Sequence, residues 1–179
     1  SWKDDDGTVL DNYTGNYGKH AWFYFTPETG RVRYATSGSY QEIKIDDATY
    51  CVDERGIIQL GWIKQRGASP AVSGYKYYAE KDTDQYKVGQ RVDKGWIKTV
   101  GPDEDSTGNE EWFYIQDSGY PVCASPGTRK IETIDGKRYL FDSYGNAQSG
   151  LQEVNGRVYC FGKGEGDFAA LTGTVRIND

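Results

Sequence analysis

The chain has 179 residues, a formal net charge of −6, and an unusual wealth of aromatic residues and glycine, including 15 tyrosines and 23 glycines. Its basic residues stand singly among acids, which argues against nucleic acid and, by charge alone, against a strongly anionic polymer as partner. No apolar run approaches the ~20 residues that span a bilayer, so we expect no membrane insertion.

The composition predicts an all-β chain. Aromatic residues combined with abundant Gly, Asp, Asn and Thr favour strands and tight turns over helices. No window shows apolar residues at helical spacing. The length suits one domain or one repeat array of similar mass.

A four-residue strand core, rich in aromatic and apolar residues, recurs along the chain. Its copies begin at residues 22, 49, 76, 112, 138 and 158. In order they read Trp22-Phe23-Tyr24-Phe25, Thr49-Tyr50-Cys51-Val52, Lys76-Tyr77-Tyr78-Ala79, Trp112-Phe113-Tyr114-Ile115, Arg138-Tyr139-Leu140-Phe141 and Val158-Tyr159-Cys160-Phe161. Each core is followed by a polar turn, usually with a glycine, and then by a short second strand.

Turn signals separate the cores. Asp135-Gly136 and Asn155-Gly156 each lie between apolar runs, which is a strong hairpin pattern. Gly61-Trp62 and Gly95-Trp96 open two nearly identical tetrapeptides. We therefore predict tandem β-hairpin repeats in a single array over residues 1–179, with units of approximately 1–34, 35–60, 61–94, 95–124, 125–149 and 150–179. A lone hairpin is marginal in water, so the units should stack as a β-solenoid.

Alternation along each core suggests which side is buried, because successive side chains of a strand point to opposite faces. The second and fourth positions are apolar or aromatic in every copy, so we expect them to face inward. The first and third positions are mixed, so we expect that face to meet solvent or a groove.

The periodic pattern of Gly-Trp, a spacer, an aromatic core and a glycine turn resembles the choline-binding and related cell-wall-binding repeats of Gram-positive surface proteins. It is also similar to the glucan-binding repeats of glucansucrases and to the C-terminal repeats of large clostridial toxins. The resemblance covers most of residues 20–173 and implies a superhelical stack of hairpins. It further implies ligands held by aromatic rings, either a quaternary ammonium group in a cage or sugar rings on flat aromatic surfaces.

Carried over residue by residue, the two cage tryptophans of the choline-binding repeats correspond to Trp96 and Trp112, and also to Trp2 and Trp22. In the unit with Trp62, the second position is Lys76, a cation that would repel choline. The third ring should come from the following hairpin. That position is Leu140 after Trp112 and Cys51 after Trp22, and a shift by one residue gives Tyr139 and Tyr50, which resemble core residues. We therefore favour a carbohydrate or wall polymer over choline.

Candidate ligand-binding residues are the rings of the mixed face and of the Gly-Trp starts. They are Trp22, Tyr24, Trp62, Tyr78, Trp96, Trp112 and Tyr114. The alternative for each is a structural one, in which the ring seals one hairpin against the next.

No catalytic residue, cofactor or metal site is predicted. The acidic runs Asp4–Asp6 and Asp103–Asp105 match no full calcium loop and are interpreted as solvated turns. His20 is isolated, with no nucleophile motif to pair with it. Cys51, Cys123 and Cys160 fit no metal spacing and are expected to be small semi-buried hydrophobes, with their disulfide status left open.

The sequence thus predicts a non-catalytic, extracellular binding module that attaches its parent protein to a bacterial cell-wall polymer or other glycan. We expect a secreted or cell-surface location, and we expect the chain to be a fragment of a larger protein, with its oligomeric state undetermined. Two alternatives remain: an adhesin-type protein-interaction module, because exposed Tyr and Trp also form protein hot spots, and a small cell-wall or glucan hydrolase.

Overall fold

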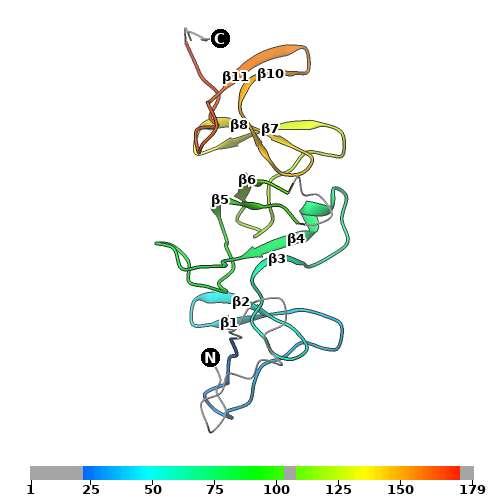
Figure 1. The fold of residues 1–179 in the computed structure, drawn as a ribbon, viewed down its shortest axis with the longest axis vertical. Helices are drawn as coiled ribbons and strands as arrows, with labels where there is room; N and C mark the ends of the chain where they lie inside the picture. Colours follow the sequence, from blue (N-terminus) through cyan, green and yellow to red (C-terminus); the bar gives the residue numbers. More distant parts are fainter. Residues whose placement is uncertain (1–21, 103–107, 174–179) are drawn as a thin grey trace. The chain divides into compact units, whose positions relative to one another are not determined.

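The computed structural model describes residues 22–102 and 108–173, which form antiparallel β-hairpins (Figure 1). The strands are β1 (Gln41–Ile45), β2 (Ala48–Val52), β3 (Gly61–Lys64), β4 (Tyr75–Tyr78), β5 (Gly95–Val100), β6 (Glu110–Ile115), β7 (Arg129–Ile134), β8 (Lys137–Asp142), β9 (Ala147–Gln148), β10 (Gly150–Val154) and β11 (Arg157–Phe161). One short 3-10 turn, η2 (Ala71–Gly74), precedes β4, and the described residues contain no α-helix. The all-β prediction is therefore confirmed. In this part of the chain no helix is long and apolar enough to cross a membrane.

The chain divides into two compact units. The first contains the described residues up to Gln65 together with Lys76–Val92, and the second contains Arg66–Tyr75 and the described residues from Asp93 onward. In the first unit, β1 pairs with β2, and Cys51, Ile63 and Tyr78 form a buried cluster. In the second unit, β5 pairs with β6, β7–β8–β9 form a three-stranded sheet, and β10 pairs with β11.

Successive hairpins of the second unit pack against each other through β8. Phe141 belongs to a buried cluster with Tyr114 of β6 and Val122, whereas Leu140 belongs to a cluster with Val154 of β10 and Phe161 of β11. Because neighbouring residues of a strand point to opposite faces, the β7–β8 hairpin has a packing partner on each side.

The tight turns form where the sequence predicts them. Asp135 and Gly136 both have positive φ, of 48° and 77°, and Asn155 and Gly156 have φ of 53° and 71°. Two residues with positive φ are the signature of the type I′ turn, whose twist matches the flanking strands. These loops connect β7 to β8 and β10 to β11.

For the five cores from residue 49 onward, the main strand pairing lies before the aromatic core rather than after it, which differs from the hairpin expected from the sequence. β6 pairs along its length with β5, which carries the Gly95-Trp96 start. After the core, most pairing is a single bridge, as for Val52 with Ile58 and Ile115 with Pro121, or the two-residue β9.

One turn is built in the same way in both units. An Asp carboxylate accepts hydrogen bonds from the backbone N–H groups two and four residues later: from Arg55 and Ile57 to Asp53, and from Tyr144 and Asn146 to Asp142, all at 2.9 Å. In both turns a glycine follows three residues after the aspartate. The carboxylate accepts hydrogen bonds from backbone N–H groups of the turn that have no backbone acceptor in the described chain.

The predicted alternation of buried and solvent-facing positions is wrong for several strands. Fourth-position residues are buried, except Phe25, which is 45% exposed, but four third-position residues are buried as well: Cys51, Tyr78, Tyr114 and Leu140. The physical reason is visible at β8, where a hairpin with a neighbour on each side buries both of its faces. The expectation of semi-buried cysteines fits Cys123 and Cys160, which are partly buried, whereas Cys51 is fully buried, and none of the three forms a disulfide.

Candidate functional site

One face of the β5–β6 hairpin gathers several of the predicted ligand-binding rings. Trp96 pairs directly with Tyr114, and Lys98 pairs with Trp112. Directly paired residues of antiparallel strands share a face, and so do residues two positions apart. Trp96, Trp112 and Tyr114 therefore lie together on one side, with the Lys98 side chain beside Trp112.

Trp96 is the centre of an aromatic cluster. Its ring lies 5.2 Å from that of Tyr114 and 5.0 Å from that of Tyr139, measured between centroids. It stacks on Phe141 at 5.8 Å with an interplanar angle of 20°. Tyr139 is thus the ring that the next hairpin contributes, one position before Leu140 in β8. Trp96 is half-buried and packs between the β5–β6 and β7–β8 hairpins. This corresponds to the structural alternative, in which the ring seals one hairpin against the next.

Phe168 covers the remaining aromatic surface. Its ring stacks on Trp96 at 6.2 Å and 17°, and it meets Trp112 at 6.2 Å and 56°. The segment that carries it is fixed by backbone hydrogen bonds from Gly162 N–H to the Ala169 carbonyl (3.0 Å) and from Ala170 N–H to the Arg138 carbonyl (2.7 Å). The sequence analysis did not identify Phe168, which stands outside every repeated core.

A groove of about 500 Å³ opens beside Trp112. We call it the Trp112 groove. Its lining contains two aromatic residues, one lysine, several carboxylates, neutral hydrogen-bonding side chains and two small residues. They are Lys98, Glu110, Glu111, Trp112, Asp142, Asn146, Ala147, Gln148, Ser149, Gln152, Gly164, Glu165 and Phe168. The indole Nε1 of Trp112 is buried and has no hydrogen-bond partner among the described residues. An unsatisfied buried donor costs free energy, so its presence at a groove is unusual.

Asp142 is a half-buried carboxyl in the lining of the groove. Burial raises its pKa, although hydrogen bonds from the backbone of Asn146 and Tyr144 oppose the rise. Its second oxygen accepts a hydrogen bond from the Gln148 amide at 3.1 Å. Both oxygens are thus engaged by the turn, as at Asp53, so Asp142 acts here as a turn-forming residue.

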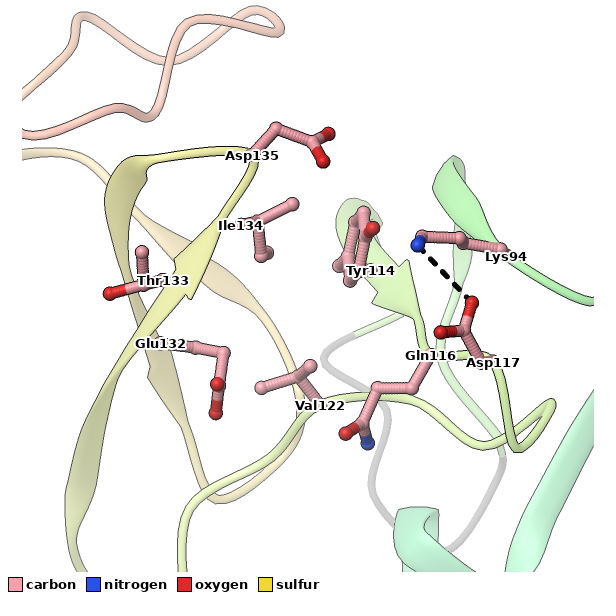
Figure 2. Close-up of a pocket in the computed structure, with 9 residues that line it drawn as sticks. All are labelled: Lys94, Tyr114, Gln116, Asp117, Val122, Glu132, Thr133, Ile134 and Asp135. Carbon is pink, nitrogen blue, oxygen red and sulfur yellow. Dashed lines mark ion pairs between the residues drawn. The ribbon is translucent and has the colours of Figure 1, made fainter.

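A smaller cleft of about 220 Å³ lies at the other side of the aromatic cluster, next to Tyr114 (Figure 2). Figure 2 shows Lys94, Tyr114 and Asp117 facing the β7 residues Glu132–Ile134 and Asp135. Lys94 and Asp117 form an ion pair at 3.2 Å. Tyr114 is buried, and burial raises its pKa.

In the first unit, the Trp62 ring meets the Tyr77 ring edge-on at 5.2 Å. The second cage position holds Lys76, whose ammonium pairs with Glu42 at 3.0 Å. Glu42 also accepts hydrogen bonds from Tyr78 (2.9 Å) and Arg91 (2.8 Å). Burial by itself would raise the pKa of Glu42, but the hydrogen bonds from Arg91, Lys76 and Tyr78 outweigh it and hold the pKa below its usual range.

The other rings predicted to bind ligand differ in how far they are exposed to solvent. Trp22 is 45% exposed and Tyr24 is half-buried, whereas Tyr78 is 0% exposed and offers no free ring face. Trp2, His20 and both acidic runs lie outside the described residues. Among the residues that are described, no group of His, Cys, Asp and Glu side chains is arranged to hold a metal ion.

No protein-family model matches the chain, and no curated protein matches it. Among solved structures, choline binding protein F from Streptococcus pneumoniae matches in one crystal form with a TM-score of 0.53 and 19% identity, covering 88% of this chain and 58% of that one. The same protein in the presence of a peptidoglycan analogue, a tetrasaccharide-pentapeptide, matches with a TM-score of 0.55 and 20% identity, covering 86% and 50%. Its complex with ipratropium matches with a TM-score of 0.52 and 20% identity, covering 88% and 60%.

This chain therefore spans between half and three fifths of the length of these neighbours. At such identities the likeness concerns the fold. It confirms the resemblance that the repeated cores and Gly-Trp starts indicate: the chain has the fold of the choline-binding-type repeat proteins.

Proposed function

We propose that this chain is a non-catalytic binding module that attaches its parent protein to a bacterial cell-wall polymer or other glycan through aromatic grooves between stacked hairpins. The observation that carries the proposal is the Trp112 groove, where an indole with a buried, unpartnered N–H lies among amide, hydroxyl and carboxylate side chains.

The lining chemistry of this groove suits a sugar. A sugar ring has apolar C–H faces that pack on an aromatic surface, and hydroxyl groups that both donate and accept hydrogen bonds. Gln148, Ser149 and Gln152 supply amide and hydroxyl groups that also do both. A few polar groups around an apolar surface are typical of small-ligand sites. The Trp112 N–H would find in a bound hydroxyl the acceptor that the protein does not provide.

A glycan is favoured over choline because cations stand where a choline cage would form. Lys98 is paired with Trp112 across the strands, and Lys76 occupies the second cage position in the first unit. A positive charge next to a ring offsets the attraction between the ring face and a quaternary ammonium. Phe168 moreover covers the ring surface shared by Trp96 and Trp112.

The solenoid and the hairpin units 1–34, 35–60, 61–94, 95–124, 125–149 and 150–179 are part of this proposal. Packing of β8 against hairpins on both sides supports such a stack within the second unit. Trp22, Tyr24, Trp62, Tyr78, Trp96, Trp112 and Tyr114 remain the proposed ligand-binding set. Within it, Trp112 and Trp22 would contact ligand most directly, and the buried rings would support them. Several weak sites in one array would bind a polymer by avidity.

A cell-surface location and a non-catalytic role follow from the same proposal. The structural neighbours are named as choline binding proteins, and one was solved in the presence of a peptidoglycan analogue. The carboxyls of the Trp112 groove are the alternative starting point for a hydrolase, which needs an acid and a second carboxylate. Asp142 is unsuited to that role because the turn engages both of its oxygens.

The test is retention of the chain on isolated Gram-positive walls, on dextran and on choline-agarose in parallel. We expect retention on walls or dextran, at least tenfold weaker retention for Trp112→Ala, and unchanged retention for Tyr34→Ala, whose ring is 64% exposed and lies outside the groove. Retention on choline-agarose that free choline reverses would contradict the preference for a glycan. Binding to a purified host protein but not to walls would favour the adhesin, and release of reducing ends by the chain would favour the hydrolase.

A further inference from the structure

We propose a second ligand site in the second unit, which binds an anionic group, phosphate or carboxylate, carried on a sugar or polyol chain. It is a pocket of about 850 Å³ that shares no lining residue with the Trp112 groove. We call it the basic pocket. Its lining comes from the segment before β7, from β7 and from the β10–β11 hairpin: Cys123, Ala124, Ser125, Thr128, Arg129, Lys130, Ile131, Val154, Asn155, Arg157 and Tyr159.

The charge of this pocket is opposite to that of the chain. The protein carries a net charge of −6, yet three of the lining residues are cations, Arg129, Lys130 and Arg157, and none is acidic. Arg129 and Lys130 are adjacent in the sequence, whereas Arg157 lies on a different hairpin. The packing of the β7–β8 hairpin against the β10–β11 hairpin brings the three residues to one pocket. A concave site lined by one sign of charge concentrates ligands of the other sign.

Arg129 is held in place by neutral acceptors. Its guanidinium donates to the side-chain oxygen of Gln152 and to the backbone carbonyl of Glu153, the latter at 3.2 Å. These bonds fix the orientation of the side chain without neutralising its charge, and no carboxylate of the described chain pairs with it. A guanidinium that is planar, oriented and charged matches the geometry of phosphate and carboxylate oxygens.

The other two cations differ in how much charge they offer. Lys130 forms an ion pair with Glu132 at 2.7 Å, so part of its charge is already compensated. Arg157 is exposed at the start of β11 and has no ion-pair partner in the described part of the chain. Arg129 and Arg157 are therefore the two residues expected to dominate anion binding.

The rest of the lining indicates a ligand larger than a bare ion. Tyr159 contributes an aromatic ring. The Arg138 guanidinium lies 5.6 Å from the centroid of this ring, and the Phe161 ring lies 6.0 Å from it, measured between centroids. Ser125 and Asn155 add neutral hydrogen-bonding groups, and Ile131 and Val154 add apolar surface. An aromatic plate, neutral polar groups and oriented cations together suit an acidic or phosphorylated sugar or polyol.

The test is a titration of the whole chain, followed by two-dimensional NMR, with four probes: glycerol 3-phosphate, galacturonate, and their uncharged counterparts glycerol and galactose. We expect at least one anionic probe to bind tenfold or more tightly than its neutral counterpart, with affinity falling as salt rises because the contact is between charges. The probe that binds identifies phosphate or carboxylate as the group recognised.

Two variants locate the site. Arg157→Gln, at an exposed position, should weaken binding about tenfold, and Arg129→Gln should weaken it further. Lys137→Gln, which removes an exposed cation outside the lining, should leave binding unchanged. Equal affinity for charged and neutral probes, or full affinity in Arg157→Gln, would overturn the basic pocket without touching the proposal for the Trp112 groove.

Discussion

Leu140 and Phe141 are consecutive residues of β8 that bury their side chains against different hairpins, Leu140 toward β10–β11 and Phe141 toward β5–β6. Both are 0% exposed. Side chains pointing to opposite faces of one strand thus hold three successive hairpins together.

Truncating either residue should therefore destabilise the second unit. We expect Leu140→Ala and Phe141→Ala each to lower the free energy of unfolding by about 3–5 kcal/mol, the cost of a cavity in a packed core. Val158→Ala is the control, because Val158 is 70% exposed, and it should change stability by less than about 0.5 kcal/mol. Urea denaturation followed by circular dichroism measures all three. A small loss for Leu140→Ala would show that the last two hairpins do not depend on each other.

Much of this hairpin architecture could be predicted from the sequence, because turns and repeats have local causes. Asp135-Gly136 and Asn155-Gly156 adopt the positive φ that hairpin loops need, and the pattern is readable without knowing any neighbour. The face assignment could not be predicted in this way. Whether Tyr78 or Leu140 is exposed depends on a second packing partner, which lies elsewhere in the chain.

The site could be predicted only in part, because some of its contacts depend on how separate segments of the chain pack together. The Gly-Trp start and the strand core place Trp96 and Trp112 on one face, as their spacing indicates. The contribution of Tyr139 depends on how the next hairpin is set, and that of Phe168 on a segment outside the repeats. The gathering of Arg129 and Arg157 depends on how the β7–β8 and β10–β11 hairpins pack, which composition alone does not reveal.

Removing the Phe168 ring should uncover the tryptophans that it covers. We expect Phe168→Ala to cost about 2–4 kcal/mol of stability. It should also increase quenching of tryptophan fluorescence by acrylamide, because Phe168 packs on both Trp96 and Trp112. Phe25→Ala, at a position that is 45% exposed, should leave stability nearly unchanged. Unchanged quenching in Phe168→Ala would contradict the packing of this ring on the tryptophans.

The first unit should lose stability when Glu42 loses its charge. Glu42→Gln leaves Lys76 and Arg91, both largely buried, without their carboxylate, which should cost about 2–4 kcal/mol. The control is Asp117→Asn, which breaks the exposed ion pair with Lys94 and should change stability little, because solvent screens an exposed pair. Equal losses in the two variants would show that Glu42 does not organise the unit.

The lowered pKa of Glu42 also predicts how the stability of the first unit changes with pH. Its carboxylate is favoured in the folded state, so its contribution is fully present above the ordinary pKa of 4.5 and is lost as the pH falls through the lower folded value. Urea midpoints measured from pH 7 to pH 3 should fall for the wild type, and part of that fall should be missing in Glu42→Gln. Parallel pH profiles would contradict the assignment.

Cys51 should be the least reactive of the three thiols. Burial raises its pKa from 9.0 to about 11, so hardly any thiolate forms near neutral pH. At pH 8 we expect iodoacetamide to modify Cys123 and Cys160, which are partly buried, well before Cys51. Because the folded state keeps the Cys51 proton, its contribution to stability is full below pH 9 and is lost between pH 9 and about 11. Peptide mapping after a timed reaction decides the order, and early labelling of Cys51 in folded protein would contradict it.

The most direct measurement of glycan binding is the indole N–H signal of Trp112 during titration with soluble glycan strands released from Gram-positive walls. Trp112→Phe identifies the signal in the two-dimensional spectrum, and the Nε1 atom of this groove-lining residue is buried without a partner among the described residues. If a sugar hydroxyl accepts from this donor, the signal should shift progressively and saturably as the glycan is added. A Trp112 signal that stays fixed while the strands bind the protein would contradict the central claim.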